Sequence, residues 1–429
     1  MKSTRVKLRN LVIYQIYVRN FSKAGTFKEV ISELDRIKDL GVDVVYLLPI
    51  HPVGEVGKKG SLGCPYSIKD YRSVALELGT MDDFKQLIDE VHIRKMKIMM
   101  DVVYNHTSND SVLLESHPEY FYKNKTGKIS CKVEDWSDVS DFDYSIDKAL
   151  WEELSNILVM YSEMGIDAYR CDVASLVPKE FWKLARKKVS RVNRSTFWLS
   201  ESVHGEFCKY LRDLGHTCMS ESEVYEVFDM AYDYDVQPYY EDYLFGKRPL
   251  RDYLEAVKRQ EEIYPENYVK MKNLENHDFD RIAKYVNNDL EKIKNWTALN
   301  YFQKGAVMLY AGEEFLADIK PSLFEKDVFN KNGDISNFIK KLNKLKKKSI
   351  FAKGIFNVNI PEIDGVAYNT VENDFEKYIG IFNVGLVKAE LQVDLPNGRY
   401  RNFLNGKIVS VNNGSIQLGL DPVIFRLKK

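Results

Sequence analysis

The chain has 429 residues, with 62 lysines and arginines against 63 aspartates and glutamates, so its formal net charge is −1. This balance argues against a nucleic-acid-binding protein, which concentrates basic residues on one face. No run approaches the roughly 18–20 apolar residues that span a bilayer, so neither nucleic acid nor membrane is an expected partner.

The cysteines and the N-terminus predict a cytoplasmic protein. The basic N-terminal residues lack the small-residue cleavage site of a secretory signal. The cysteine count is odd and no C-x-x-C pair occurs, which argues against a disulfide framework and a structural zinc site. The five cysteines are Cys64, Cys131, Cys171, Cys208 and Cys218.

Short apolar, β-branched runs recur along the first 310 residues, and segments with helical periodicity separate them. The expected strands are Val12–Val18, Val42–Pro49, Lys97–Val103, Ile166–Arg170, Thr196–Leu199, Val227–Tyr232, Val269–Leu274 and Ala306–Tyr310. The clearest expected helices are Phe27–Leu40, Met81–Val91, Ala149–Met164 and Trp182–Val192.

Eight strands alternating with helices predict an α/β fold of the (β/α)8 TIM-barrel type. The structural alternative is a doubly wound sheet. That fold rarely needs eight evenly spaced strands, and it usually carries a glycine-rich phosphate loop, which this sequence lacks.

Two segments do not fit a bare barrel. Residues 105–147 are too long for an ordinary βα loop and predict a small inserted subdomain B after the third strand. Residues 351–429 lose helical periodicity and show short β-type runs between Gly, Asn and Pro turns, which predict a C-terminal all-β sandwich. The barrel is therefore assigned to residues 1–104 and 148–350.

Polar residues follow several of the expected strands. Catalytic groups of such barrels lie at the carboxyl ends of the strands, so side chains from different strands converge there. Burying several like charges together is costly unless function requires it. The converging residues are Asp172, Glu201, Asp278, His106, His277 and Arg170.

Two reaction classes use such a cluster: metal-assisted hydrolysis and glycoside hydrolysis. Arg170 lies two residues before Asp172, on the same face of the strand. A fixed cation there would keep Asp172 ionised and would repel a metal ion. The glycosidase interpretation is therefore favoured.

Four sequence blocks then resemble the α-amylase superfamily of retaining glycoside hydrolases. In order, they are residues 101–106 (DVVYNH), 165–174 (GIDAYRCDVA), 198–202 (WLSES) and 276–278 (NHD). The loop at residues 63–67 also resembles the one that places a sugar-stacking tyrosine in that family.

The resemblance implies a role for each residue. Asp172 would be the nucleophile, Glu201 the general acid and base, and Asp278 the stabiliser of the transition state. Tyr66, His106, Arg170 and His277 would bind substrate, and Asp101 would orient Arg170. Retention demands that the carboxyls of Asp172 and Glu201 lie about 5–5.5 Å apart. It also requires Asp172 ionised and Glu201 protonated, which predicts a bell-shaped pH profile.

No cofactor or metal site is expected. Many α-amylases follow the nucleophile with Lys-His, which supports a calcium site, whereas residues 175–178 here read SLVP. Calcium needs six to eight oxygen ligands. Asn105 with Asp135 or Asp138 would supply only part of such a shell, so calcium is possible but not favoured.

The predicted function is hydrolysis of α-1,4 bonds in maltooligosaccharides. Two alternatives with the same catalytic set are a 4-α-glucanotransferase and an exo-acting α-glucosidase, because loop shape decides whether water or a sugar reaches the intermediate. A remote alternative is a non-catalytic sugar-binding protein on an amylase scaffold. Endo or exo action, α-1,4 or α-1,6 preference and oligomeric state stay open.

Overall fold

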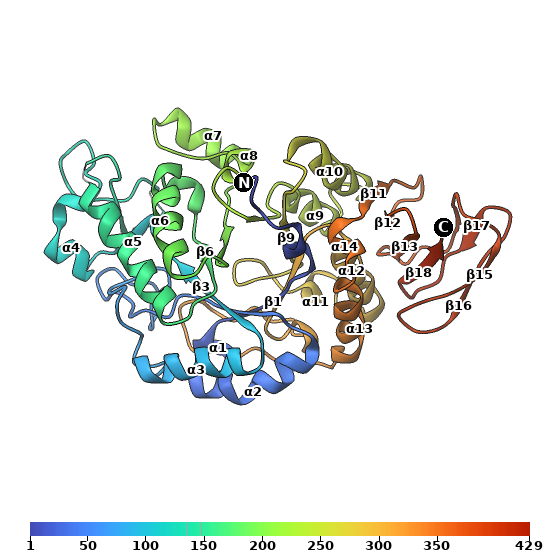
Figure 1. The fold of residues 1–429 in the computed structure, drawn as a ribbon, viewed down its shortest axis with the longest axis horizontal. Coiled ribbons are helices and arrows are strands. Elements are labelled where there is room, and N and C mark those ends of the chain that lie inside the picture. Colours follow the sequence, from blue (N-terminus) through green and yellow to red (C-terminus); the bar gives the residue numbers. More distant parts are fainter. Residues whose placement is uncertain (134, 147) are drawn as a thin grey trace. The chain divides into compact units, whose positions relative to one another are not determined.

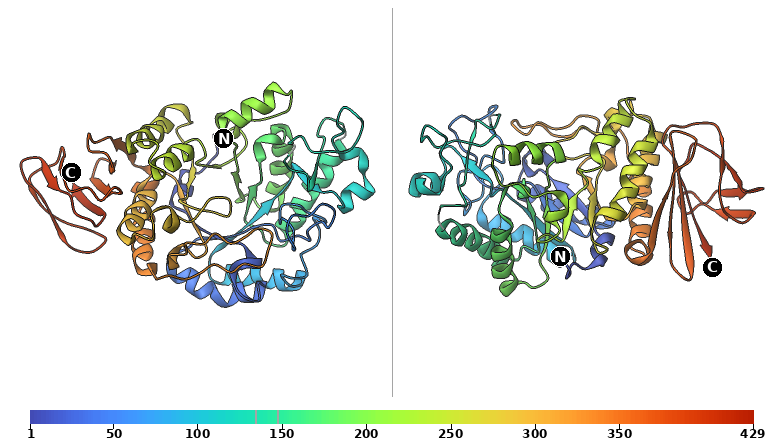
Figure 2. Two further views of the ribbon diagram at one scale, coloured as in Figure 1. Left: turned by 180° about the vertical axis from the view of Figure 1, so that it is seen from behind. Right: turned by 90° about the horizontal axis from the view of Figure 1, so that it is seen from above.

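The structure is a computed structural model that describes residues 1–133, 135–146 and 148–429 (Figures 1 and 2). It divides into two compact units. The first comprises Met1, Tyr14–Tyr232 and Pro321–Phe329, and the second comprises Lys2–Ile13, Asp233–Lys320 and Asn330–Lys429.

Eight strands form a closed barrel, which confirms the predicted fold class. Each strand falls at a predicted position, although most are shorter at one or both ends. In barrel order the strands are β1 (Val12–Ile16), β10 (Ala306–Tyr310), β9 (Lys270–Lys272), β8 (Met230–Tyr232), β7 (Phe197–Ser200), β6 (Ala168–Cys171), β3 (Lys97–Val102) and β2 (Val44–Leu47).

The register of the parallel strands determines which residues meet at their carboxyl ends. Asp101 of β3 pairs with Arg170 of β6, and Cys171 of β6 pairs with Ser200 of β7. Asp172 and Glu201, each one residue further along, therefore leave neighbouring strands at the same level.

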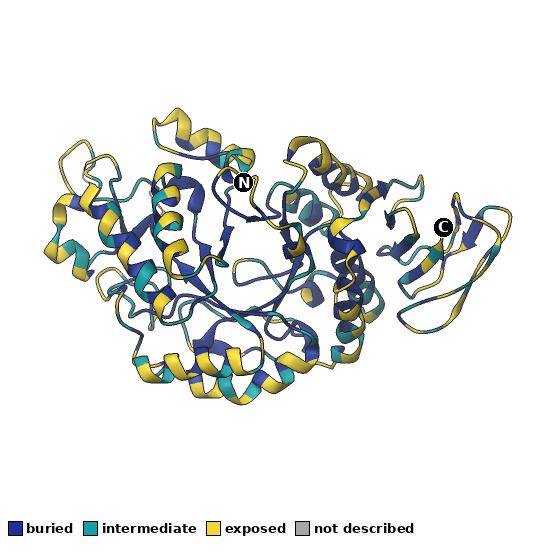
Figure 3. Cartoon of the chain, viewed as in Figure 1, coloured by how far each residue is buried: buried dark blue, intermediate teal, exposed yellow. Residues whose placement is uncertain are grey.

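The helices α2 and α3 of the first unit are amphipathic, with one face buried and the other exposed (Figure 3). The Thr26 side chain caps the start of α2, and Gly41, with a φ of +100°, ends it, as left-handed glycines often do. The helices are α1 (Val18–Phe21), α2 (Phe27–Leu40), α3 (Met81–Ile93), α4 (Val112–Ser116), α5 (Lys148–Glu163), α6 (Lys179–Val192), α7 (Gly205–Asp213) and α8 (Glu221–Val224), with 3-10 turns η2 (Pro118–Tyr120) and η3 (Ala174–Leu176).

The segment between β3 and α5 has strands of its own. β4 (His106–Ser108) and β5 (Val139–Asp141) pair antiparallel, with His106 opposite Asp141. This pairing brings the start and the end of the segment together beside the barrel strand that precedes it. The predicted boundaries of subdomain B stay a prediction, and residue 147 lies outside the described residues.

The helices of the second unit include α12, which is buried along most of its length. They are α9 (Gln237–Leu244), α10 (Leu250–Ile263), α11 (Ile282–Tyr285), α12 (Leu290–Phe302), α13 (Ser336–Lys346) and α14 (Ile350–Lys353), with 3-10 turns η1 (Val6–Asn10) and η4 (Glu313–Phe315).

The C-terminal residues are all-β, as predicted. A four-stranded antiparallel sheet runs in the order β11 (Ile355–Asn359), β12 (Val366–Glu372), β13 (Glu376–Asn383) and β18 (Val423–Lys428). The pairs β14 (Glu390–Gln392) with β17 (Ser415–Gln417) and β15 (Gly398–Arg401) with β16 (Ile408–Val411) complete it. One apolar core joins Ile379 and Phe425 of the large sheet to Leu391, Val411 and Ile416 of the pairs.

Across the described ranges, no helix combines the length and the apolar character needed to cross a membrane.

Candidate active site

Arg170 lies at the centre of the carboxylate cluster. Its Nη1 lies 2.9 Å from Oδ1 of Asp101 and 2.8 Å from Oδ1 of Asp172, and its Nη2 lies 2.6 Å from Oε1 of Glu201. All four residues are buried and come from the ends of β3, β6 and β7. One guanidinium therefore holds both candidate catalytic carboxylates as close neighbours.

Asp101 acts as a support for this arginine, as predicted. Its Oδ2 accepts hydrogen bonds from the hydroxyls of Tyr46 at 2.7 Å and Tyr66 at 2.9 Å, while Oδ1 faces Arg170. The guanidinium carbon of Arg170 lies 5.5 Å from the ring centre of Tyr66 and 5.6 Å from that of Tyr232. The planar cation is thus fixed by a carboxylate and by two aromatic rings.

Asp172 presents its two oxygens to different partners. Arg170 binds Oδ1, and Oδ2 lies 4.0 Å from Nε2 of His106. Burial raises the pKa of the Asp172 carboxyl well above its ordinary value; Arg170 opposes this effect, and Glu201 and Asp101 add to it. Arg170 was expected to keep Asp172 ionised, but a single cation shared by three carboxylates offsets only part of the cost of burial.

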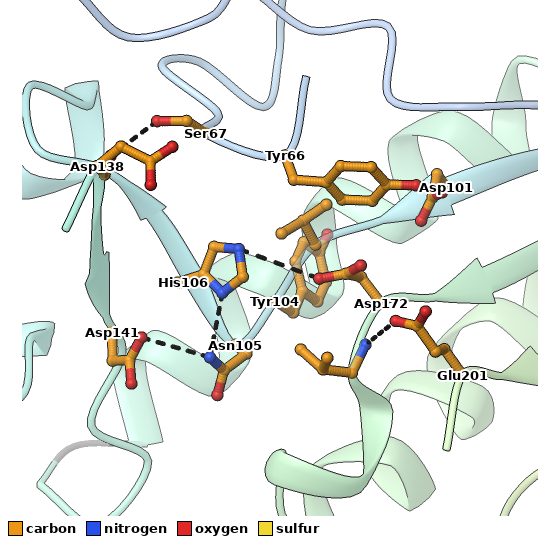
Figure 4. A network of polar contacts seen from close by, with 12 residues as sticks. Tyr66, Ser67, Asp101, Tyr104, Asn105, His106, Asp138, Asp141, Asp172 and Glu201 are labelled. Atoms are coloured by element: carbon orange, nitrogen blue, oxygen red, sulfur yellow. Dashed lines mark hydrogen bonds and ion pairs between the residues drawn. The ribbon is translucent and has the colours of Figure 1, made fainter. Parts of the chain in front are cut away.

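Nε2 of His106 faces Asp172, but the 4.0 Å to Oδ2 of Asp172 is too long for a hydrogen bond (Figure 4). The side-chain amide of Asn105 lies 3.1 Å from Nδ1 of His106 and donates to Oδ1 of Asp141 at 3.3 Å. Because an amide nitrogen can only donate, Nδ1 accepts and Nε2 carries the ring proton. Burial lowers the pKa of His106 to about 4. Trp136 packs edge-on against its ring, with 5.4 Å between the ring centres.

Glu201 has a partner at each oxygen. Oε1 meets Arg170, and Oε2 accepts a hydrogen bond of 2.8 Å from the backbone N–H of Val173. Val173 directly follows Asp172 and has a φ of +33°, in the left-handed region. A β-branched residue is rare there, and such strain is common at functional sites. Here the strained turn points the amide of Val173 at the candidate acid.

Asp278 and His277 lie in the second unit, whereas Tyr66, His106, Arg170, Asp172 and Glu201 lie together in the first. Nε2 of His277, a buried residue, is 3.3 Å from Oδ2 of Asp278, whose side chain is 41% exposed. Asn276 fixes this turn by accepting the backbone N–H of Asp278 at 2.8 Å. The charged group of Asp278 is therefore accessible to a ligand.

Comparison with known proteins places the chain in a family. The model of the α-amylase catalytic domain matches residues 15–136 and 132–349, and that of the bacterial α-amylase C-terminal domain matches residues 353–425. The chain belongs to the α-amylase family. It is therefore an enzyme of the glycoside hydrolase type.

The known proteins similar to this α-amylase family member match different shares of its length. A solved α-amylase from Lactobacillus plantarum is 40% identical, covers 99% of this chain and 100% of its own, and has a TM-score of 0.95. A maltogenic α-amylase from Thermotoga neapolitana is 31% identical over 99% of this chain and 100% of its own, with a TM-score of 0.88. The α-1,4-glucan:maltose-1-phosphate maltosyltransferase of Myxococcus xanthus is 25% identical over 58% of this chain, and this chain spans 40% of that relative.

The oxygens considered for calcium have other partners in this structure. Nζ of Lys59 lies 2.8 Å from the carboxylate of Asp138 and 3.2 Å from the backbone oxygen of Asp135. Asn105 turns its amide nitrogen, not its oxygen, toward Asp141. An ammonium group beside these oxygens and a donor in place of an acceptor both oppose cation binding. Within the described residues no group of three or more His, Cys, Asp or Glu is suited to a metal.

Three contributors to the site were not predicted from the sequence. Tyr46 supports Asp101, Tyr232 covers Arg170, and the backbone of Val173 contacts Glu201. Tyr232 ends a predicted barrel strand, so its position was a usable signal. Val173 contacts Glu201 through its backbone N–H. The valine side chain therefore gave no indication of this contact.

Proposed function

We propose that this enzyme hydrolyses α-1,4-glucosidic bonds in maltooligosaccharides by double displacement with retention. The observation that carries the proposal is the bridge from Arg170 to both Asp172 and Glu201. It supports a pair of carboxylates close enough for a nucleophile and an acid on one anomeric carbon. The expected separation of about 5–5.5 Å stays a prediction.

In the first step Oδ2 of Asp172, which Arg170 leaves unbound, attacks the anomeric carbon. The bond from that carbon to the glycosidic oxygen breaks, and Glu201 gives its proton to the leaving oxygen. Arg170 stabilises the carboxylate before attack, and a covalent glycosyl ester of Asp172 results.

In the second step Glu201 removes a proton from water, and the water oxygen attacks the anomeric carbon. The ester bond to Asp172 breaks and the product leaves as the α-anomer, because two inversions restore the configuration. Tyr66 and His106 would contact the sugar in the subsite that binds the reacting ring. We assign His277 and Asp278 to the same substrate, with Asp278 as stabiliser of the positively charged transition state.

Asp172 must be ionised to attack, and burial raises its pKa. Activity should therefore fall on the acid side at a pH above the ordinary range of an aspartate. The measurement that checks this is the pH profile of kcat/KM.

A 4-α-glucanotransferase is the second candidate function. It uses the same covalent ester but passes the glycosyl group to a sugar hydroxyl. The maltosyltransferase from Myxococcus xanthus, which is similar over 58% of this chain, is by its name an enzyme that transfers a glycosyl group. An exo-acting α-glucosidase shares the catalytic set and differs in how the cleft admits the chain end.

We further propose that the enzyme acts in a reducing compartment, such as the cytoplasm, and needs no calcium. All five cysteines are free thiols, which suits reducing surroundings. Lys59 at Asp138 supports independence from calcium.

The test is a time course of maltoheptaose digestion that resolves every product by length and anomer. Shorter α-anomers with a matching gain in reducing ends support hydrolysis. Redistribution of chain lengths without that gain would replace hydrolysis by transfer, and glucose or maltose alone from the first minute indicates exo action. First-formed β-anomers would refute the retaining mechanism.

The Asp172→Asn variant lacks the proposed nucleophile and should be inactive in this assay. Asp167→Asn is its matched control. Asp167 directly precedes β6 and pairs with His92 and Lys97, at the strand end opposite to the site. We expect it to keep activity within about twofold, as for an additive distant site.

A further inference from the structure

The C-terminal β region carries a cavity of about 610 Å³ that the proposed function does not use. Its walls come from α13 and the residues after it, from β13, from β15 and the turn that follows, and from β18. The volume lies in the range of small-molecule sites, roughly 300–1,000 Å³. All of its lining belongs to the second unit.

The charged residues that line this cavity are all basic. Its lining includes Lys341, Lys348, Arg401 and Arg426, and no carboxylate among the described residues. The chain as a whole carries 62 basic against 63 acidic residues, so the excess is local. A neighbouring cavity of about 850 Å³ shows the contrast, since three carboxylates and a single cation, Lys407, line it.

Most of this positive charge is not neutralised by the protein. Arg426 pairs with Glu376 at 2.5 Å, just outside the lining. Nζ of Lys341 donates to the backbone oxygen of Leu404, a contact that leaves its full charge in place. Arg401 and Lys348 are exposed, and within the described residues neither side chain has an acidic partner. Three cationic groups therefore face one cavity without a counter-charge.

Three aromatic residues also line the cavity, beside Asn402, Leu404, Asn405 and Gly406. Tyr378 and Phe425 are buried, and Tyr400 stacks on Phe425 with 4.7 Å between ring centres. Phe403 is only half-buried, so its ring is the one of the three that a ligand can reach. The ring of a ligand can lie against Phe403 while an attached anion meets the cations.

We propose that this cavity binds a phosphate monoester attached to a ring, either a sugar or a nucleoside. Arg401 would bind the phosphate oxygens through its planar fork. Lys348 and Lys341 would add point charges, and Phe403 would cover the ring. The site is separate from the carboxylate cluster of the first unit and does not depend on the proposed hydrolysis.

The experiment measures binding of glucose 6-phosphate, AMP, inorganic phosphate and glucose to the full chain by calorimetry at low salt. We expect at least one ester to bind more tightly than inorganic phosphate, glucose not to bind at this site, and affinity to fall with added salt. The ester that binds better identifies the sugar or the nucleoside as the ring. Ester affinity no greater than that of inorganic phosphate would refute the role of Phe403.

Variants locate the site. The double change Arg401→Gln with Lys348→Gln should weaken ester binding by about tenfold or more, as for lost charge-assisted contacts. Lys407→Gln removes one charge from the neighbouring cavity, where Lys407 pairs with Asp421 at 2.6 Å, and should leave binding unchanged. Both variants change exposed residues, and unaltered thermal unfolding verifies the fold. Wild-type affinity in the double variant, or no ester binding by the wild type, would overturn the proposal.

Discussion

At the scale of residues, the candidate site has fewer positive than negative groups. Arg170 contacts three buried carboxylates, Asp101, Asp172 and Glu201. The proposed ester at Asp172 would be favoured by this arrangement, because a carboxylate oxygen that no cation holds is the better nucleophile. The shortage of positive groups also has a cost in stability, since ionised groups are buried together.

The first prediction concerns that cost. The raised pKa of Asp172 means that its ionisation favours the unfolded chain, so its contribution to stability is lost as the pH rises above about 3.8. Asp172→Asn should therefore raise the melting temperature near neutral pH, by about 1–3 °C. The gain should shrink toward pH 5. Melting curves of both proteins at several pH values check this, and a gain that grows on acidification would contradict it.

A second prediction concerns the support of Arg170. Tyr46→Phe removes the hydroxyl that binds Asp101 and leaves the ring in place. We expect kcat to fall by about tenfold, on the order of one lost hydrogen bond, with KM little changed. Tyr169→Phe is the control, because the Tyr169 hydroxyl binds the backbone of Leu158 away from the site. Equal losses in the two variants would show that Tyr46 has only a structural role.

Side-chain chemistry at strand ends was predictable, and backbone and ring contacts were not. Arg170 and Asp172 are two residues apart on one strand, so their shared face followed from the pleat. The contact of Val173 with Glu201 depends on a left-handed turn at Val173. A β-branched residue is rare in that conformation, so the sequence does not predict the turn. The raised pKa of Asp172 required knowledge of how many carboxylates share one arginine.

At the scale of elements, the start of α3 is fixed by its sequence. Thr80 accepts the backbone N–H of Asp83, and the Asp83 side chain accepts the backbone N–H of Thr80. This reciprocal capping box satisfies two donors at the helix start. It anchors the helix that directly precedes β3, the strand that carries Asp101.

The third prediction is that Thr80→Ala lowers the free energy of unfolding by about 1 kcal/mol. Activity of the remaining folded protein should be unchanged, because the hydrogen bonds of the cap involve no residue of the carboxylate cluster. Ser190→Ala in α6, which truncates an exposed helical hydroxyl, is not expected to destabilise. Chemical unfolding of the wild type and the two variants tests this prediction. An unchanged free energy of unfolding in Thr80→Ala would show that the cap does not stabilise the protein.

The eight barrel strands followed from periodicity because each is a short, buried, β-branched run. The β-type runs expected after residue 353 coincide with β11, β13, β14, β16 and β18, whereas β12, β15 and β17 were not predicted. β12 contains Tyr368, Asn369 and Thr370, which are all buried. Both faces of this strand are packed although it contains polar residues, so its sequence lacks the apolar pattern of a buried strand. β15 and β17 are short and flanked by Gly and Asn, which in sequence alone indicate turns.

At the scale of the whole molecule, the free thiols predict insensitivity to reductants, and the ion pair of Lys59 with Asp138 predicts insensitivity to chelators. The fourth prediction is that excess EDTA leaves the melting temperature and the activity unchanged, because Lys59 already binds Asp138. The measurement is a thermal scan with and without chelator, followed by addition of calcium. A loss that calcium restores would show that oxygens other than those of Asp135 and Asp138 form a calcium site.

The central claim is that Asp172 forms a covalent ester with the sugar, and trapping that ester tests it most directly. α-Maltosyl fluoride needs no acid to leave, so the Glu201→Gln variant should form the ester and hydrolyse it slowly. Intact mass spectrometry should then show one added maltosyl group, and peptide mapping should place it on Asp172. No adduct with Glu201→Gln, or an adduct on another residue, would contradict the mechanism.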